Sequence, residues 1–379
     1  MSQGFTSSDM RTWVIETVLP FWADRCWDNA NPGFVEALSL EGEQCAGDAR
    51  RVRVQARQIY TFATAASEGM LPVGADIAQK GFETYLRQCF PDGLDSGCVH
   101  VIAADGTITD NRRDLYDQAF ALLAASGMIR LSDDPRAKIL AESVGAFIDQ
   151  ALASDYGGWQ EDSLNTLPRR QNPHMHLFEA SMALFAATGD DAWQARAAKI
   201  YDLFTNYFFD CDQGLLFEFF ADDWSRCPDK GSLIEPGHMM EWAWLLSEFG
   251  RRFATDTSNE VRVLHDGALA AITDPGALLL PNSVRAHSTD KSSSRRLWPQ
   301  TEHLRALCAL DRLGTFDIDR SNAVANAIFH DYIEGMPGGL WCDEVRLDGT
   351  RISEKVPASI LYHLIECAMA MGEHVPAAA

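Results

Sequence analysis

Six polar residues recur along the chain at intervals of about 60 residues, each near the start of an apolar run. Each run reaches a glycine, and four runs open with a proline, as helices often do at their two ends. A fixed period of this length indicates a repeat architecture that brings the six polar side chains to one level. These residues are Arg57, Tyr116, His176, His238, Glu302 and His363; the glycines are Gly69, Gly127, Gly189, Gly250, Gly314 and Gly372, and the prolines are Pro173, Pro236, Pro299 and Pro357.

Six amphipathic stretches alternate with these runs, approximately at 9–24, 75–90, 134–153, 190–208, 257–272 and 317–333. Their apolar residues return every three or four positions, and Asp134 and Asp190 are suitable helix N-caps. The alternation predicts an all-α fold, an (α/α)6 barrel of twelve helices with short β-hairpins in the loops, as one domain over residues 1–379. All inner helices then begin at one mouth. An open α-solenoid with only a groove is the alternative.

Composition restricts the partners of this chain. The formal net charge of −22 argues against binding to nucleic acid or to anionic membranes. The N-terminus has no signal-like pattern and no apolar run is long enough to span a membrane, so a cytoplasmic monomer or homodimer is expected. The nine cysteines include no CxxC pair, which is typical of small buried residues in a reducing compartment.

Three of the inner runs contain a histidine followed three residues later by a glutamate, a spacing that puts both on one helical face. Histidine is the usual group for moving a proton near neutral pH, and a carboxylate one turn away can hold its tautomer. Each pair alone is also a common surface pair, but three in register favour a shared site. The pairs are His176 with Glu179, His238 with Glu241, and His363 with Glu366.

A metal site is the second interpretation of these histidines, since three of them with a glutamate are able to ligate zinc. The spacing of two histidines four residues apart on one helix is absent, so we expect no metal. We expect no cofactor either, because the sequence contains no GxxxxGK[ST], no GxGxxG after a strand, and no GxSxG.

Other polar and aromatic residues accompany the histidines at the same level. Arg57 lies in a largely apolar run and needs either an acidic partner or an anionic ligand. Tyr116 is a candidate hydroxyl donor to a ligand. The segment RRLWPQTEHLRAL offers Trp298, Gln300 and Glu302, and an aromatic ring there suits the apolar face of a sugar.

Paired arginines precede three of the inner runs, where helix N-termini also attract anions. They are Arg112–Arg113, Arg169–Arg170 and Arg295–Arg296, with Lys291 close to the last pair. Two interpretations stay open: a site for a phosphate or sulfonate on the substrate, or neutralisation of the many acidic loop residues.

The motifs RQNPHMHLFEA, EPGHMMEWAWLL, RLWPQTE and RQIY resemble those of the N-acylglucosamine 2-epimerase superfamily, which includes D-mannose isomerases and cellobiose 2-epimerases. The likeness extends over nearly the whole chain and implies an (α/α)6 barrel. It implies catalytic roles for His238 and His363, with His176 in the pocket and Glu241 beside His238. It also implies that Arg57 contacts the sugar and that Asn172 lines the pocket.

The C-terminal segment KVPASILYHLIECA is most similar to the mannose and mannose 6-phosphate isomerase branch. The resemblance therefore implies isomerisation of a mannose-type hexose, free or phosphorylated, to the corresponding fructose through a cis-enediol. A sugar 2-epimerase using the same residues and an (α/α)6-barrel glycosidase with two opposed carboxylates are the alternatives.

Overall fold

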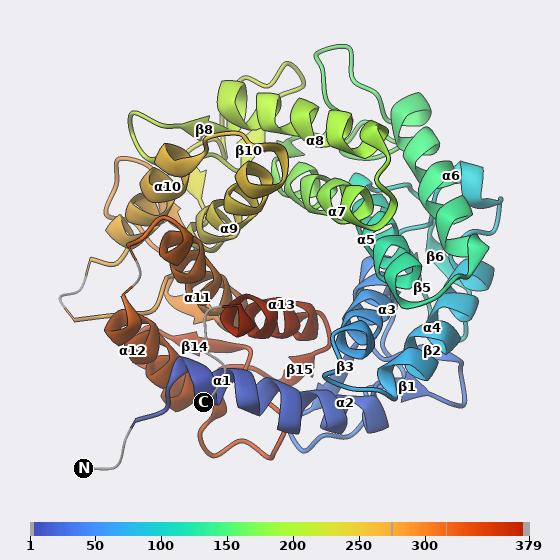
Figure 1. Ribbon diagram of the computed structural model, residues 1–379, viewed down its shortest axis with the longest axis horizontal. Coiled ribbons are helices and arrows are strands. Elements are labelled where there is room, and N and C mark those ends of the chain that lie inside the picture. The colour runs from blue at the N-terminus through green and yellow to red at the C-terminus, as the bar shows by residue number, and fades with distance from the viewer. Residues whose placement is uncertain (1–3, 274–275, 316, 374–379) are drawn as a thin grey trace.

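The computed structural model describes residues 4–273, 276–315 and 317–373, and its helices form two concentric rings (Figure 1). Every inner helix corresponds to one of the six apolar runs. The inner ring consists of α3 (Val52–Ser67), α5 (Leu115–Leu131), α7 (Asn172–Thr188), α9 (Pro236–Phe253), α11 (Leu297–Arg312) and α13 (Ile360–Gly372). Each inner helix contacts the next, and α13 contacts α3, so the ring is closed and the fold is not an open solenoid.

The outer ring follows the amphipathic stretches. Its first member is a continuous run of α1 (Ser7–Trp13), a π-helical turn (Val14–Val18) and α2 (Leu19–Arg25). The predicted caps are confirmed: Asp134 accepts a hydrogen bond from the Arg136 amide and Asp190 accepts one from the Ala192 amide. The other outer helices are α4 (Gly74–Gln88), α6 (Pro135–Ala151), α8 (Asp191–Leu203), α10 (Ser258–Ala270) and α12 (Ile318–Ile328).

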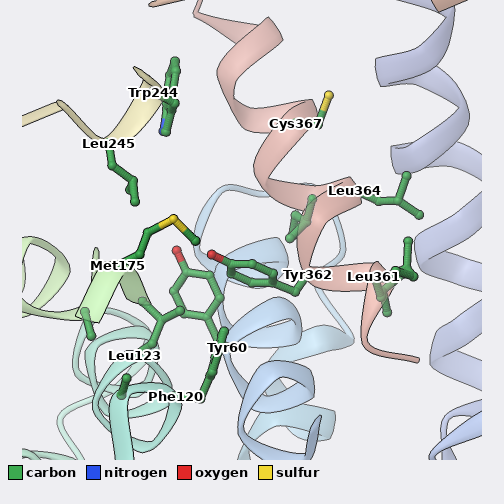
Figure 2. Close-up of a cluster of buried hydrophobic side chains, with 14 of the residues drawn as sticks. Tyr60, Phe120, Leu123, Met175, Trp244, Leu245, Leu361, Tyr362, Leu364 and Cys367 are labelled. Carbon is green, nitrogen blue, oxygen red and sulfur yellow. The ribbon is translucent and has the colours of Figure 1, made fainter. Parts of the chain in front are cut away.

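The core lies between the inner helices and against the outer ring. Because an inner helix has neighbours on nearly every side, α5 is buried along almost its whole length. Figure 2 shows Tyr60, Phe120, Met175 and Tyr362, from four inner helices, with their side chains gathered together. This aromatic and aliphatic packing fixes the inner helices relative to one another, which a preorganised site requires.

Short antiparallel strand pairs occupy the loops, several of them immediately before an inner helix. β15 pairs with β3, which joins the C-terminal and N-terminal parts of the ring. The strands are β1 (Trp27–Asp28), β2 (Gly33–Phe34), β3 (Ala37–Ser39), β4 (Arg50–Arg51), β5 (Val101–Ile102), β6 (Ile108–Asp110), β7 (Arg169–Arg170), β8 (Phe209–Asp210), β9 (Leu215–Leu216), β10 (Phe219–Phe220), β11 (Leu233–Ile234), β12 (Val284–Arg285), β13 (Ser294–Arg296), β14 (Glu344–Arg346) and β15 (Lys355–Pro357).

The glycines and prolines expected at the helix ends are only partly in those positions. Gly189 ends α7 in the left-handed conformation, as expected, but Gly127 and Gly250 lie inside α5 and α9. A Cβ on Gly127 would lie 3.2 Å from the Tyr60 ring, so this glycine permits close packing of α5 on α3. At the other end, Pro357 belongs to β15 and precedes α13 rather than opening it.

Candidate active site

A cavity of about 390 Å³ lies at the N-terminal ends of the inner helices. The period predicted this arrangement, because residues near the start of each inner helix reach one mouth. Nine of the predicted site residues line the cavity: Arg57, Tyr116, Asn172, His176, His238, Glu241, Arg296, Trp298 and His363.

The other predicted residues lie outside the lining of this cavity. Arg296 lines the cavity, whereas Arg295 and Lys291 line a separate cavity beside α12 and do not reach the histidines. Gln300 is fully buried and hydrogen bonds the backbone of Leu280. Glu302 is also fully buried and lies behind the wall, so it contacts a catalytic candidate instead of the cavity.

His238 is held by a carboxylate from a loop hairpin. Its Nδ1 atom lies 3.0 Å from Oε2 of Glu218 and 3.5 Å from Oε2 of Glu235. Burial disfavours the charged ring, but the negative charges of Glu218 and Glu235 outweigh it and raise the pKa of His238 from 6.5 to about 10. His238 is therefore an imidazolium at neutral pH, able to donate a proton.

The Asn172 side chain faces the other nitrogen of this ring. Its amide nitrogen is placed 2.9 Å from Nε2 of His238, while its Oδ1 atom is buried without a hydrogen bond. Nitrogen and oxygen of an asparagine amide are interchangeable by rotation. The rotated amide accepts a hydrogen bond from the imidazolium through its oxygen, whereas the placed one donates a hydrogen bond to a neutral ring, so Asn172 accommodates both states of His238.

His363 has the opposite protonation state. Its Nδ1 atom lies 2.8 Å from Oε1 of Glu302, which leaves Nε2 as the ring nitrogen for the cavity. Burial lowers the pKa of His363 to about 3 despite the hydrogen bond to Glu302. His363 is therefore neutral at pH 7 and able to accept a proton.

Glu302 is kept ionised by a buried arginine. Arg305 lies one turn away on α11, with NH1 at 2.7 Å from Glu302 and NH2 at 2.9 Å from Glu366 of α13. Burial alone would raise the pKa of Glu302, but Arg305 and His363 lower it below its usual value. A chain of charged groups thus joins α11 to α13 beneath the cavity.

Only one of the three predicted histidine–glutamate pairs forms within its own helix. His176 Nδ1 lies 3.1 Å from Glu179, whereas Glu366 bonds Arg305 and Tyr60. Among the described residues, neither oxygen of Glu241 has a hydrogen-bond partner, and its Oε1 atom lies 3.8 Å from Nε2 of His176. Burial and the charges of Glu302 and Glu179 raise the pKa of Glu241 well above its usual value, which favours the neutral form of this cavity-lining carboxyl group.

Arg57 supplies a buried positive charge next to these groups. Its guanidinium donates to the Tyr116 hydroxyl at 2.8 Å and lies 4.2 Å from the centre of the Phe120 ring. No ion pair between described residues includes Arg57, so its charge is not neutralised by a carboxylate. Such an arginine is suited to an anionic ligand or intermediate.

Trp298 lies between the two candidate catalytic histidines. Its ring centre is 5.0 Å from that of His238 and 5.4 Å from that of His363. A flat apolar ring flanked by a proton donor and a proton acceptor can position a sugar so that both histidines reach it.

Several residues of the site were not predicted. Glu218 follows β9 in the segment GLLFEFF, where only a strand-like pattern is visible in the sequence. Arg51 and Arg53 line the cavity, and Arg50–Arg51 is a pair preceding an inner helix, the same signal that drew attention to the other arginine pairs. The remaining unpredicted lining residues are Leu233, Glu235, Asn282, Ser283, Ser359 and Ile360.

Three groups of side chains in and behind the cavity wall have donor atoms close enough to share a metal ion. They are His176 with Glu179 and Glu241, His238 with Glu218 and Glu235, and His363 with Glu241 and Glu302. Burial favours the neutral form of Glu241 in the first and third groups, and the carboxylates of Glu218 and Glu235 favour the protonated form of His238 in the second. A metal ion would have to displace these protons.

The chain is similar in sequence to several known proteins. A family model described as N-acylglucosamine 2-epimerase (GlcNAc 2-epimerase) matches residues 33–367. The chain is 33% identical over 375 residues to a mannose-6-phosphate isomerase of Rhizobium meliloti, covering 96% of this chain and 95% of the relative. It is 30% identical to a D-mannose isomerase of Thermobifida fusca over about half of each protein.

Solved structures share the fold at low sequence identity. A cellobiose 2-epimerase from Bacillus thermoamylovorans aligns with a TM-score of 0.86 at 18% identity, covering 97% of this chain and 99% of the other. A D-mannose isomerase aligns with a TM-score of 0.82 at 20% identity, covering 96% and 97%. A family 76 glycoside hydrolase from Bacteroides thetaiotaomicron aligns at 0.67, so the barrel alone does not determine the chemistry.

Proposed function

Because the chain belongs to the N-acylglucosamine 2-epimerase family, we propose that it is an aldose–ketose isomerase of a mannose-type hexose, with or without a 6-phosphate. The observation that carries this proposal is the pair His238 and His363, which line one cavity in opposite protonation states on either side of Trp298. The full-length similarity to a relative named mannose-6-phosphate isomerase supports it.

The proposed reaction proceeds through a cis-enediol. Neutral His363 removes the proton from C2 of the open-chain aldose, and the proton returns at C1 to give the ketose. Protonated His238 opens the ring and moves protons on O1 and O2. The C2 proton is weakly acidic, so the enediolate requires stabilisation as it forms, and the unneutralised charge of Arg57 provides it.

The other lining residues bind the substrate in this proposal. The neutral carboxyl group of Glu241, the Tyr116 hydroxyl and the Asn172 amide offer hydrogen bonds to sugar hydroxyls, and Trp298 packs on the apolar face of the ring. His176 stacks on Tyr116 with ring centres 5.0 Å apart and completes the wall. Glu302 and Gln300 act indirectly, by holding His363 and the loop at Leu280.

We further propose that residues 1–379 act as one catalytic domain, in the cytoplasm, as a monomer or homodimer, without metal or nucleic acid. The nine cysteines support a reducing environment, since all of them are free. In the part of the chain that the structure describes, no helix has the length and apolar character needed to cross a membrane.

A 2-epimerase is the second candidate, because relatives named cellobiose 2-epimerase also match this chain. An epimerase with these residues returns the proton to the opposite face of C2 and gives glucose instead of fructose. A glycosidase is less suitable. It needs two carboxyl groups facing one bond, and Glu302 lies outside the cavity, bonded to His363 and Arg305.

Product analysis tests the proposal directly. The purified protein is incubated with mannose and with mannose 6-phosphate, and the products are separated and identified. Fructose or fructose 6-phosphate is the expected product. Glucose or glucose 6-phosphate as the first product supports epimerisation, and no change of either sugar contradicts both candidates.

A further inference from the structure

We propose that the rim of this cavity contains a subsite for the phosphate group of a hexose 6-phosphate, formed by Arg51, Arg296 and the N-terminus of α13. The inference rests on the proposed function, and it narrows the substrate to the phosphorylated sugar. It also replaces the arginine collar expected from the sequence, because Arg295 and Lys291 lie at another cavity.

The two arginines lie on either side of α13. Arg51 immediately precedes α3 and Arg296 immediately precedes α11, and these helices are the two neighbours of α13 in the inner ring (Figure 1). Arg296 forms an ion pair with Asp343 at 3.1 Å, and the charge of Arg51 also acts on Asp343. Both arginines therefore belong to the part of the cavity lining next to α13.

Each guanidinium group is held by a carboxylate that does not line the cavity. Arg51 is paired through Nε with Glu36, and Arg296 is paired through Nε and NH2 with Asp343. Neither Glu36 nor Asp343 lines the cavity, whereas both arginines do. Their side chains are 39% and 38% exposed, so the remaining N–H groups are accessible to a ligand. Fixed guanidinium groups of this kind are suited to binding phosphate oxygens.

The start of α13 adds a third element. Ser359 is the N-cap of this helix of 13 residues, and its side chain makes no capping hydrogen bond. Ser359 lines the cavity and is only 5% exposed, and among the described contacts its hydroxyl has no hydrogen-bond partner. A hydroxyl that has no described partner, at a helix N-terminus that lines the same cavity as two arginines, is suited to binding an anion.

Two acidic residues line the same cavity, Glu241 within α9 and Glu235 at its N-cap. Glu235 precedes α9 and lies 3.5 Å from Nδ1 of His238, so it belongs to the histidine rather than to the start of α13. Burial raises the pKa of Glu235, while His238 acts against that increase. Four arginines line the same cavity as these two acidic residues: Arg51, Arg53, Arg57 and Arg296.

The distance between the proposed phosphate subsite and His363 is suited to one hexose phosphate. His363 lies four residues after Ser359, which is slightly more than one turn, or about 6 Å along the helix. A phosphate at the N-terminus of α13 therefore leaves the other end of a six-carbon chain near His363. Binding of the phosphate would position C1 and C2 for proton transfer without touching them.

The experiment compares two substrates and matched arginine variants. Steady-state constants and calorimetric affinities are measured with mannose 6-phosphate and with mannose for the wild type, Arg51→Met, Arg296→Met and Arg295→Met. Loss of Arg51 or Arg296 should weaken the binding of the phosphorylated sugar at least about tenfold more than the binding of the neutral sugar. Arg295→Met, the neighbour paired with Asp331, should affect both sugars equally and by less than about twofold.

A second variant guards against misfolding of the arginine variants. Ser359→Asp retains a favourable N-cap, so the helix is preserved, but its charge repels a phosphate. This variant should also weaken the binding of mannose 6-phosphate more than the binding of mannose. Equal effects on both sugars, or no affinity of the wild type for mannose 6-phosphate, would overturn the subsite. Failure of the proposed function is distinct: the wild type would then bind the phosphorylated sugar without converting it.

Discussion

The Glu218 carboxylate lies 3.0 Å from Nδ1 of His238, although the two residues come from a loop hairpin and from an inner helix. Glu218 also accepts a hydrogen bond from the Gln171 amide, and Trp242 in turn donates to Gln171. Glu218 is therefore held in place independently of His238. In the proposed mechanism, this fixed carboxylate keeps His238 protonated as the acid, while His363, held by Glu302, is the neutral base.

Replacement of Glu218 by glutamine should move the alkaline limit of activity. His238 acts as an acid only while protonated, and its pKa is raised to about 10, so wild-type activity should fall as the pH rises through about 10. Glu218→Gln removes the largest raising influence, and the pKa should return toward 6.5. We expect the alkaline limb of kcat to move down by more than about one pH unit, measured by a full pH profile.

The raised pKa of His238 also makes the stability of the folded state depend on pH. A histidine with a raised pKa stabilises the folded state fully below 6.5, and this stabilisation is lost as the pH rises through about 10. Glu218→Gln should therefore lose stability near neutral pH and little above pH 10. Glu235→Gln is the matched control with a smaller shift, since Glu235 is farther away and partly exposed. Identical profiles for all three proteins would contradict the role of Glu218.

Alanine substitutions test the two histidines themselves. His238→Ala and His363→Ala should each lower kcat by about 10²-fold or more, because general acid or base catalysis contributes this much. Circular dichroism should show an intact fold. His330→Ala is the control, since His330 is an exposed histidine paired with Glu334. Near-normal turnover in either test variant would remove that histidine from the mechanism.

The sequence predicted the architecture well because a barrel repeats one physical requirement six times. Each inner helix must be apolar along its length, must start at the mouth and must be followed by an amphipathic outer helix. The six repeated polar residues therefore lie at one level, and five of them line the cavity. Glu302 is the exception, since α11 directs it toward His363 of the neighbouring helix.

The partners of the histidines could not be predicted as well. The spacing of three residues shows that Glu241 and Glu366 can lie on the same face as a histidine, but not which of several carboxylates is closest. That depends on how adjacent helices and loops pack. Glu218 follows a hairpin strand, and Arg305 is hidden in a helix pattern, so neither had a signal of its own. The arginine pairs were visible, but most are held by loop acids, such as Arg113 by Asp92.

Metal dependence is tested by chelation. If an ion bound by one of the three donor groups around the cavity takes part in the reaction, its removal should abolish activity. We expect exhaustive dialysis against a chelator to leave kcat unchanged, because a metal ion would have to displace the proton on His238 and the proton that burial favours on Glu241. Elemental analysis of the purified protein provides the control. Loss of activity that zinc or manganese restores would convert the histidines from proton-transfer groups to ligands.

Arg305 should determine both the stability of the inner ring and the orientation of His363. It is fully buried and bridges Glu302 and Glu366, so Arg305→Met leaves two carboxylates without their charge partner. Breaking a buried ion pair in this way typically costs about 3–5 kcal/mol. The melting temperature should therefore fall clearly, as measured by thermal denaturation.

The same variant should alter catalysis through the pKa of Glu302. Arg305 is the main group that lowers this pKa against burial, so its removal favours the neutral carboxyl form, which no longer holds the His363 tautomer as firmly. We expect kcat to fall more than KM rises, because Arg305 does not line the substrate cavity. Arg312→Met on the same helix is the matched control, since Arg312 pairs with Glu248 and Glu373 away from the histidines. A positioning role for Arg305 is contradicted if both variants lose stability equally and keep wild-type kcat.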